Sequence, residues 1–508
     1  MNQYLLGIDI GTSGCKSIII DEHGKIISEA FSGYNVDIPK PGWSEQNPED
    51  WWQAVKLTVS ELLRNFQFVS NIRCIGLSGQ MHGMVLMDKY DRVLRPCILW
   101  SDQRNEKQCL DIQERAGGIK NLIKMTNNKM LTGYTGGKII WSLENEPMVF
   151  QKTKVVLNPK DYIRFKLTGE YATEVSDASG TGLFNVKKRM WSDELLNKLG
   201  ISKSILPTCY ESTEISGRLS GCASEVLGLP YDLPVTGGGG DAIIQSIGSC
   251  KNTGKSFCAI LGTGGQITTS LDYYCENPDG ALQIFCNVIP GKWHAMGVML
   301  TAGGALRWFK DVLSDESSES TSADYFRKMD NEASLIPVGS ENLLFLPYLS
   351  GERCPHNDPN ARGAFIGLNL KHGRSHFVRS VLEGVAFGFK DLANNISKLG
   401  IKPESVYMSG GGANSFLWRQ ILSDILNMNV YTLNSAGYGG AYGAALIAGL
   451  SIGIWPSIEK ASESLKIETE NNPVSLHVSQ YNALYQIYRQ LYPALWDSFN
   501  SIARIANY

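Results

Sequence analysis

Short apolar runs separated by glycine-rich turns open the chain and predict β-strands. Residues 4–10, residues 16–20 and the segment near Ile26 are rich in Ile and Leu, and a tight turn at 11–14 joins the first two. Runs of this length between glycine turns are typical of strands joined as a meander. Asp9 ends the first run beside the first turn. We therefore expect a β-meander that opens a domain.

Helical and strand signals then alternate, as in α/β proteins. Asn47 is an N-cap residue followed by proline, and the helix that it starts is expected to run to about Phe66. The apolar run at 72–77 predicts a buried strand. Four consecutive glycines at 237–240 follow another strand and lead into Asp241, which we expect to begin a helix.

The opening pattern recurs about 250 residues later, which suggests two related halves. An apolar run at 256–261 is followed by the turn Gly262-Thr263-Gly264 and a returning run at 266–270. No low-complexity linker separates the two copies. We expect a domain boundary near 246–256, with a hinge at that place.

The last third of the chain reads as largely helical. Residues 376–399 predict a long helix that ends at Gly400. Residues 406–409 predict a strand, and another helix is expected to start at Asn414. The tail at 479–499 carries an apolar stripe at helical spacing, which favours a core face: Tyr481, Leu484, Tyr488, Leu491 and Leu495.

Composition excludes several classes of protein. The chain has 508 residues, 43% of them hydrophobic, so it is not disordered, and its net charge of −3 favours neither nucleic acid nor a membrane surface as a partner. No secretory signal is visible, and the longest apolar stretch, 441–455, is too short to span a bilayer. The 11 scattered cysteines fit reduced thiols of a cytoplasmic enzyme.

The two glycine turns are candidate anion sites. Backbone N–H groups in such turns can face a phosphate, and Thr12, Ser13 and Thr263 add hydroxyl donors. One glycine turn is weak evidence, but two copies strengthen it. The chain lacks the Walker A pattern of P-loop proteins. Lys16 could offset phosphate charge, although a lysine on a hairpin usually faces solvent.

Two carboxylates stand beside glycine-rich turns. Asp9, next to a phosphate-sized turn, suggests Mg²⁺ bound largely through water; the alternative is an edge carboxylate that accepts hydrogen bonds from the turn. Asp241 begins a helix, whose N-terminus favours the ionised form, so we expect a base rather than an acid at neutral pH. The alternative is a plain N-cap, which would not need four glycines before it.

Further polar residues follow predicted strands. Met81 and His82 lie on a glycine-flanked loop at 78–83, where α/β domains often bind ligands, although a single histidine is more often structural. Asp102 and Arg104 could hold sugar hydroxyls or form a surface ion pair of little energetic value.

Together these features resemble the FGGY family of carbohydrate kinases, and the resemblance covers essentially the whole chain. The first family signature is similar to residues 133–145, with Lys138 and Trp141 in place and Ser142 where an aliphatic residue is usual. The second is similar to residues 363–383. The longest local matches are to members of the family that phosphorylate xylulose: residues 43–52, 78–83, 95–104, 159–181 and 345–368.

The resemblance implies two actin/hexokinase-like (ribonuclease H-like) α/β domains with an interdomain catalytic cleft. It implies a sugar-binding domain at 1–250, a nucleotide-binding domain at 251–450 and a helical segment at 451–508 that packs back on the core. Met81 and His82 would contact a ketopentose, Asp241 would be the catalytic base, and Asp9 would lie near Mg²⁺. The residues expected along the ATP site are Gly11, Thr12, Ser13, Lys16, Gly262, Thr263, Gly264, Gly303, Gly411, Gly412 and Asn414.

The expected reaction is ATP-dependent phosphorylation of D-xylulose to D-xylulose 5-phosphate. Ala242 departs from the family, which usually places Asn or Gln after the catalytic Asp, and loss of such a polar contact can change sugar discrimination. Another pentulose, a polyol or a sugar acid therefore stays open as the substrate. A non-catalytic sugar sensor or an actin-like ATPase is the alternative from another class. A homodimer is a family-level expectation.

Overall fold

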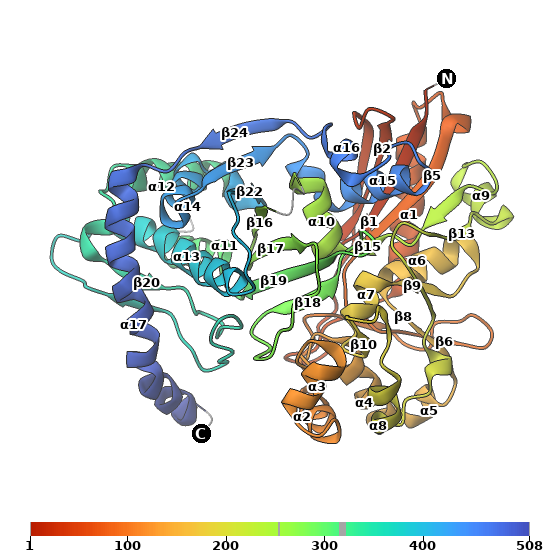
Figure 1. Ribbon diagram of the computed structural model, residues 1–508, viewed down its shortest axis with the longest axis horizontal. Coiled ribbons are helices and arrows are strands. Elements are labelled where there is room, and N and C mark those ends of the chain that lie inside the picture. Colours follow the sequence, from red (N-terminus) through yellow and green to blue (C-terminus); the bar gives the residue numbers. More distant parts are fainter. Residues whose placement is uncertain (1, 252–254, 314–321, 507–508) are drawn as a thin grey trace. The chain divides into compact units, whose positions relative to one another are not determined.

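The computed structural model describes residues 2–251, 255–313 and 322–506, which form two compact units (Figure 1). Unit 1 contains Met1–Thr253, Ser270–His294 and Tyr438–Leu465, and unit 2 contains Gly254–Thr269, Ala295–Gly437 and Lys466–Tyr508. Each unit is therefore assembled from three separate stretches of chain. The hinge expected at 246–256 includes residues 252–254, which lie outside the described residues.

The sheet of unit 1 contains the predicted opening meander. Its strands follow the order β13-β14-β5-β1-β2-β3, with β1 antiparallel to β2 and parallel to β5. The strands are β1 (Tyr4–Ile10), β2 (Gly14–Asp21), β3 (Ile26–Gly33), β5 (Ile72–Gly79), β13 (Ile215–Arg218) and β14 (Pro234–Thr236). A short strand, β15 (Gly239–Gly240), also pairs with β5, so half of the predicted glycine loop is strand.

Five strands of the unit 2 sheet repeat the order and pairing directions found in unit 1. The order β24-β23-β22-β16-β17-β19 has the same parallel and antiparallel neighbours from β24 to β17 as β13 to β2 in unit 1. These strands are β16 (Ser256–Leu261), β17 (Gly265–Leu271), β19 (Trp293–Met299), β22 (Ser405–Ser409), β23 (Asn429–Leu433) and β24 (Ile467–Asn471). Three residues join the central hairpin in each unit, 11–13 and 262–264, which confirms the two related halves.

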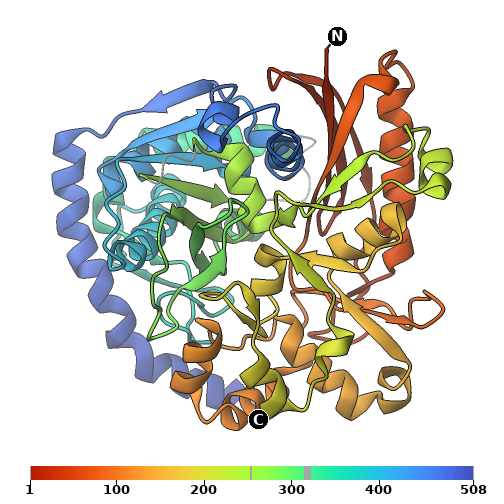
Figure 2. The ribbon, with the colours of Figure 1, turned by 45° about the vertical axis from the view of Figure 1, so that its right-hand side comes forward.

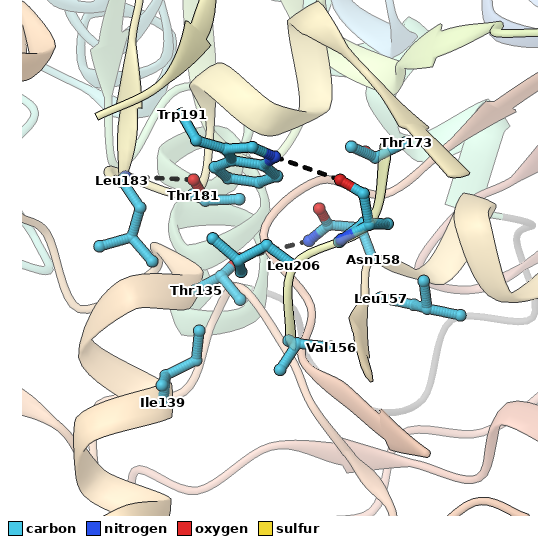
Figure 3. A pocket seen from close by; sticks show the side chains of 11 residues that line it. Thr135, Ile139, Val156, Leu157, Asn158, Thr173, Thr181, Leu183, Trp191 and Leu206 are labelled. Carbon is cyan, nitrogen blue, oxygen red and sulfur yellow. Dashed lines mark hydrogen bonds between the residues drawn. The ribbon is translucent and has the colours of Figure 1, made fainter. Parts of the chain in front are cut away.

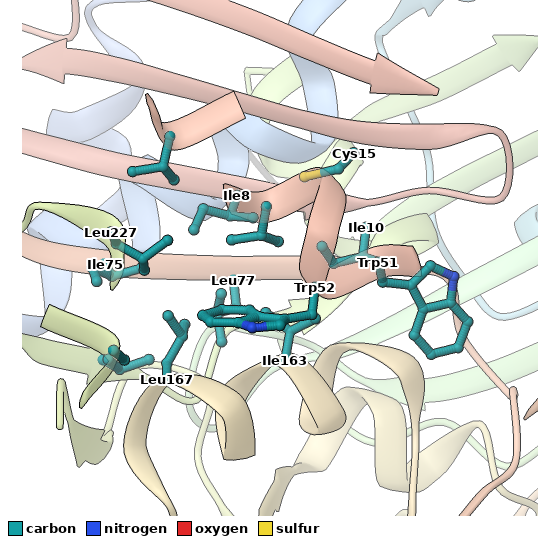
Figure 4. Packing of buried hydrophobic residues seen from close by; sticks show 14 of the residues in the cluster. Ile8, Ile10, Cys15, Trp51, Trp52, Ile75, Leu77, Ile163, Leu167 and Leu227 are labelled. Carbon is teal, nitrogen blue, oxygen red and sulfur yellow. The ribbon is translucent and has the colours of Figure 1, made fainter. Parts of the chain in front are cut away.

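One face of the unit 1 sheet carries the main apolar core. Alternate residues of β1 and β5, among them Ile8 and Leu77, pack against two helices, α1 (Pro48–Leu63) and α6 (Pro159–Thr168). Trp51 of α1 is fully buried in this cluster, and Figure 4 shows the aromatic and aliphatic side chains meeting between the sheet and the helices. The predicted cap of α1 is confirmed, because the Asn47 side chain accepts from the N–H of Glu49.

The opposite face of the same sheet is covered by α15 (Gly439–Ser451) at backbone contact. A Cβ at Gly7 would lie 2.1 Å from the carbonyl oxygen of Ala441, and a Cβ at Gly76 would lie 1.9 Å from that of Ala444. Gly7 and Gly76 are register partners on β1 and β5. The absence of both side chains lets this helix lie directly on the strands that end at the candidate site.

The other helices of unit 1 surround this sheet and a set of short strands. They are α2 (Glu106–Arg115), α3 (Ile119–Thr126), α4 (Thr135–Asn145), α5 (Pro147–Phe150), α7 (Val175–Ser179), α8 (Asp193–Leu199), α9 (Gly221–Leu227), α10 (Asp241–Ser249) and α16 (Ile458–Ser462). The short strands are β4 (Glu45–Gln46), β6 (Val85–Asp88), β7 (Cys97–Ile98), β8 (Thr153–Leu157), β9 (Ala172–Glu174), β10 (Phe184–Asn185), β11 (Met190–Trp191), β12 (Thr208–Tyr210) and β18 (Gln283–Cys286). Helix α10 packs against α15.

Unit 2 is completed by helices that include the predicted C-terminal ones. They are α11 (Gly303–Leu313), α12 (Ser322–Ser334), α13 (Arg374–Ser397), α14 (Phe416–Leu426) and α17 (Ser475–Ala506), beside the strands β20 (Leu344–Leu346) and β21 (Ala364–Ile366). Asn414 belongs to a 3₁₀ turn, and Ser415 caps α14. No helix among the described residues is long and apolar enough to cross a membrane.

Helix α17, the dark blue helix along unit 2 in Figure 2, packs on α14, and its buried tyrosines contact Phe387 of α13. Tyr481 and Tyr488 are buried as predicted, whereas Leu484 is only half-buried. Tyr485 and Phe499 are buried residues of the same segment that the predicted stripe missed. The Tyr481 hydroxyl donates to Glu383 at 2.8 Å, so buried polar contacts on α13 select the face.

Replacing Gly76 with alanine should destabilise unit 1 strongly. The added methyl group would overlap the Ala444 carbonyl, which belongs to helix backbone and cannot move aside. We expect Gly76→Ala to lower the free energy of unfolding by about 3 kcal/mol in urea titrations. Gly221→Ala is the control, because a Cβ there meets nothing within 4 Å. Equal stability of the two variants would contradict the close packing of α15.

Candidate active site

Three parallel strands end side by side in unit 1, and the candidate catalytic residues lie at their carboxyl ends. In the register of β1 and β5, Asp9 lies opposite Ser78. In the register of β15 and β5, Gly239 lies opposite the same Ser78. Asp241 follows β15 directly. Strand pairing therefore brings Asp9 and Asp241 to one edge of the sheet, which is the usual location of ligand sites in α/β domains.

Asp9 is held by the neighbouring strand and faces a helix N-terminus. The Ser78 hydroxyl donates to its Oδ1 at 2.7 Å, while the turn closes on itself through the N–H of Gly11 and the carbonyl of Gly14. A Cβ at Gly440, in the first turn of α15, would lie 2.4 Å from Oδ2. Burial raises the pKa of Asp9, and the Ser78 hydrogen bond and the Lys16 charge oppose that rise.

The residues around Asp9 determine whether a Mg²⁺ ion could bind there. Among residues 2–251, 255–313 and 322–506, no three His, Cys, Asp or Glu side chains gather as a metal site would require. Asp9 is a single, partly exposed carboxylate. One carboxylate fits a Mg²⁺ ion that keeps most of its water and takes phosphate oxygens as further ligands.

The first glycine turn is rigidly oriented. The Thr12 hydroxyl accepts from the Trp100 indole N–H at 2.9 Å and donates to the Gln80 side chain at 3.2 Å. The Gln46 amide donates to the Thr12 carbonyl at 2.8 Å. Gly11 and Thr12 are partly exposed and Ser13 is exposed, so the turn is open to a ligand.

Lys16 lies directly opposite Asp9 in the antiparallel register of β1 and β2. It is partly buried, and its ammonium group is 5.1 Å from the centre of the Tyr438 ring. The side chain therefore does not simply project into solvent, as lysines on hairpins usually do. Its charge acts on Asp9 at the edge of the sheet.

Asp241 begins α10, but its ionisation differs from the prediction. Gly240 is the N-cap, so the plain N-cap interpretation of Asp241 is wrong. The N–H of Ala242 donates to Oδ1 at 2.7 Å. Burial and the charge of Asp9 raise the pKa of Asp241 to about 7, against the opposing effect of the Ala242 and Met81 N–H groups. Desolvation outweighs the helix N-terminus, and a pKa near 7 suits a general base.

The glycines before Asp241 allow close approach on both sides. Gly238 has φ +70°, and a Cβ there would lie 2.2 Å from the Leu77 carbonyl oxygen. A Cβ at Gly240 would lie 2.5 Å from Met81 Cγ. The glycine run therefore fits Asp241 between β5 and the loop that carries Met81 and His82.

Met81 is buried and His82 is partly exposed. The backbone of His82 is left-handed, with φ +70°, and its carbonyl accepts from Lys138 Nζ at 2.8 Å and from the Thr135 hydroxyl at 3.1 Å. Its Nδ1 lies 2.6 Å from the Gly180 carbonyl oxygen. Burial lowers the pKa of Lys138 to about 7. The conformation of His82 is thus fixed from α4 and from the end of α7.

Asp102 and Arg104 form a buried pair, so the interpretation as a surface ion pair is wrong. Arg104 donates to both carboxylate oxygens, and the two side chains are 0–1% exposed. The Arg104 guanidinium lies 3.6 Å from the Trp43 ring centre, and Asp102 accepts from the N–H of Ser44 at 2.6 Å. The contacts with Trp43 and Ser44 hold the segment at 43–46 in place. This segment includes Gln46, whose amide donates to the Thr12 carbonyl.

The second glycine turn, in unit 2, rests on the start of α11. The N–H groups of Gly303 and Ala302 donate to the carbonyls of Gly262 and Thr263, both at 2.8 Å. A Cβ at Gly303 would lie 2.5 Å from the Gly262 oxygen. Thr263 is exposed, and Gly262 and Gly264 are partly exposed.

The segment at 410–414 lies beside the same end of β16. Gly410 has φ +84°, and a Cβ at Gly412 would lie 2.4 Å from Leu261 Cδ2. A Cβ at Gly411 would meet nothing within 4 Å, and Gly411 and Asn414 are exposed. Unit 2 thus brings together its own predicted nucleotide residues.

A small cavity lies between α4, β8 and the side chains of Trp191 and Leu206 (Figure 3). Its volume is about 10 Å³, which is room for one water molecule and too small for a sugar. The Asn158 amide in its wall donates to the Gly83 carbonyl at 2.9 Å and to the Thr135 hydroxyl at 3.2 Å. Asn158, in the wall of this cavity, therefore helps to hold the loop at 78–83.

Several residues of the site were missed by the sequence analysis. Ser78 was assigned to a loop, although it lies within β5, one residue before the end of the strand, and donates to Asp9. Gly440 and Gly180 carry no side-chain signal, and their contacts with Asp9 and His82 come from distant parts of the chain. Only knowledge of the strand register could have identified Ser78.

Comparison with known proteins accounts for almost the whole chain. Curated xylulose kinases from Escherichia coli K12 and Bacillus subtilis 168 are each 36% identical to it, over 96% of this chain and 99% and 97% of their own lengths. A gluconokinase from B. subtilis 168 is 29% identical over 99% of this chain and 98% of its own length. The crystal structure of a xylulose kinase from Brucella ovis superposes with a TM-score of 0.91 at 34% identity, covering 97% of this chain and all of the other.

Two family models match in succession. The N-terminal domain of the FGGY family of carbohydrate kinases matches residues 4–248, and its C-terminal domain matches residues 258–452. The predicted resemblance and fold class are confirmed: this chain belongs to the FGGY family of carbohydrate kinases.

Proposed function

We propose that this chain is an ATP-dependent kinase that converts D-xylulose to D-xylulose 5-phosphate. The observation that carries the proposal is the 36% identity to xylulose kinases over nearly the full length of both chains. The arrangement at the edge of the unit 1 sheet supports it, because Asp241 has a pKa of about 7 and stands beside a partly exposed histidine loop.

In this proposal unit 1 binds the sugar and unit 2 binds the nucleotide. Met81 and His82 contact the ketopentose, and the turn at 11–14 presents N–H groups and the Thr12 hydroxyl to phosphate. In unit 2 the turn at 262–264, Gly303 and the segment at 411–414 hold ATP. Asp102 and Arg104 act by holding the segment at 43–46, because their side chains are buried and paired.

Asp241 accepts the proton of the terminal sugar hydroxyl as that oxygen attacks the γ-phosphorus of ATP. The bond between the γ-phosphorus and the oxygen that bridges to the β-phosphate breaks, and ADP leaves. Transfer of a phosphoryl group depends mostly on positioning and on charge stabilisation, so the base has only to orient and deprotonate the hydroxyl. Asp9 would hold Mg²⁺ through water, and the ion would supply positive charge to the transferred group. Lys16, opposite Asp9, adds a second positive charge at this edge.

A sugar acid or another pentulose is the second candidate substrate. Ala242 is partly exposed next to Asp241 and cannot hydrogen-bond a sugar hydroxyl through its side chain. The similarity to a gluconokinase favours a sugar acid among the alternatives. A non-catalytic sensor is disfavoured, since the relatives are kinases and Asp241 is intact. A homodimer in the cytoplasm stays part of the proposal.

A substrate panel tests the function directly. We expect the purified protein to release ADP from Mg-ATP with D-xylulose at a kcat/KM at least about tenfold above D-ribulose, L-xylulose, L-ribulose, glycerol and gluconate. A coupled ADP assay with a no-sugar control measures this. A preference for gluconate would support the second candidate, and no sugar-dependent turnover at all would contradict a kinase.

Removing the proposed base should abolish most of the chemistry but not the fold. We expect Asp241→Asn to lower kcat by about 10²–10⁴, because an amide cannot accept the hydroxyl proton. The matched control is Asp232→Asn, an exposed carboxylate paired with Arg218 on the surface, which should keep wild-type turnover. Near-normal turnover of Asp241→Asn would exclude it as the base.

The pH dependence follows from the raised pKa of Asp241. The base works only when ionised, so kcat/KM for the sugar should fall as pH drops through about 7 and level off above it. The measurement is a pH profile at saturating Mg-ATP, from pH 5 to 9. A kcat/KM that stays constant from pH 9 down to pH 5 would mean that burial and Asp9 do not control the ionisation of this group.

A further inference from the structure

The glycine run that carries Asp241 is anchored by hydrogen bonds at both of its ends. The N–H of Gly240 donates to the Ser176 hydroxyl at 3.0 Å, and the N–H of Gly238 donates to the Ser212 carbonyl at 2.9 Å. The Gly237 carbonyl accepts from the side chain of Arg164. No glycine has a side chain with which to hold itself, so these contacts fix the position of the next residue, Asp241.

Glu174 connects the two serines of this anchor. One carboxylate oxygen accepts from the Ser176 hydroxyl at 2.8 Å, and the other accepts from the Ser212 hydroxyl at 2.5 Å. Glu174 is fully buried and caps α7 by accepting the N–H groups of Ser176 and Asp177 at 2.8 and 2.9 Å. The four hydrogen-bond donors hold the carboxylate in one position. Each serine in turn accepts a hydrogen bond from a backbone N–H of the glycine run and so holds that run in place.

Two buried cations complete the support. Lys160 and Arg164 are fully buried and share the Asp161 carboxylate, at 2.6 and 2.7 Å. Lys160 also lies 3.7 Å from Glu174 and 3.3 Å from Asp177. This network is rigid because its charged groups are paired. Through its contacts with the Gly237 carbonyl it holds the start of the glycine run in place.

We infer that Ser176, oriented by Glu174, is a positioning residue for Asp241. Ser176 links the buried carboxylate to the residue that precedes the base, through the chain Glu174–Ser176–Gly240. This inference rests on the proposed role of Asp241 and deepens it. Small displacements of a catalytic group are costly, so the hydroxyl should affect turnover although it touches neither sugar nor nucleotide.

An isosteric pair of variants isolates the hydroxyl. Ser176→Thr keeps the oxygen that accepts the Gly240 N–H, while Ser176→Val has the same shape without it. We expect kcat of the Val variant to be about tenfold or more below that of the Thr variant, with KM for sugar and ATP within about threefold. Equal kcat values in two variants of equal melting temperature would overturn the inference.

A second serine on the same helix supplies the matched control. Ser179 is equally buried, donates to the Val175 carbonyl and accepts the N–H of Cys286 at 3.1 Å, so it makes the same kind of contact with a different strand. Ser179→Ala should lose stability as Ser176→Ala does, while its kcat stays within about threefold of the wild type. A fall in kcat as large as that of Ser176→Ala would mean that α7 acts only through stability.

Hydrogen exchange gives a readout that does not depend on turnover. The amides of residues 237–241 should exchange faster in Ser176→Val than in Ser176→Thr, in the full chain without substrates. Unchanged exchange would overturn the positioning role even if kcat fell. If the wild type phosphorylated no sugar, the proposed function would fail, and the exchange result would still decide whether Ser176 holds the glycine run.

Discussion

The register between β1, β5 and β15 is the constraint on which the site depends. It places Asp9 opposite Ser78 and brings Asp241 to the same edge, although the three strands come from distant parts of the chain. A shift of one residue in the pairing of β1 with β5 would turn Asp9 toward the apolar face that holds Ile8. Close packing of α15 on Gly7 and Gly76 excludes such a shift, because the residues on either side of each of these glycines carry side chains.

Local sequence patterns predicted the helices and strands well. They could not predict contacts between residues that lie far apart in the sequence. The opening meander, the cap at Asn47, both glycine turns and the start of α10 follow from periodicity and turn residues within a few positions. The bond between Ser78 and Asp9 joins residues 69 positions apart, and no local pattern reports it. Strand pairing, rather than composition, creates that contact.

Burial explains where the chemistry differed from expectation. The sequence places Asp241 at a helix start, which favours the ionised form, but it does not reveal how much protein surrounds the carboxylate. Desolvation and the charge of Asp9 raise its pKa to about 7. Asp102 and Arg104 were misjudged for the same reason, since two charged residues near a tryptophan look like surface groups until the fold buries them.

The two sheets are related but chemically unequal. Ile260 occupies in β16 the position that Asp9 has in β1, one residue before the end of the strand, and it pairs with Ser409 as Asp9 pairs with Ser78. Among the described residues, the buried Ser409 hydroxyl has no hydrogen-bond partner. Unit 2 thus keeps the glycine turn and the serine but carries no carboxylate there.

Helix α15 also bears on how the protein is made. It belongs to unit 1 but is encoded after most of unit 2, so Gly76 leaves the ribosome 373 residues before Gly449 completes the contact face. At about 5–20 residues per second this interval lasts about 20–75 s. Throughout it, the two strands that bear the site lack the helix that covers one of their faces. The nascent first half therefore passes through a long stage at which a chaperone could bind it, and its active site forms only near the end of synthesis.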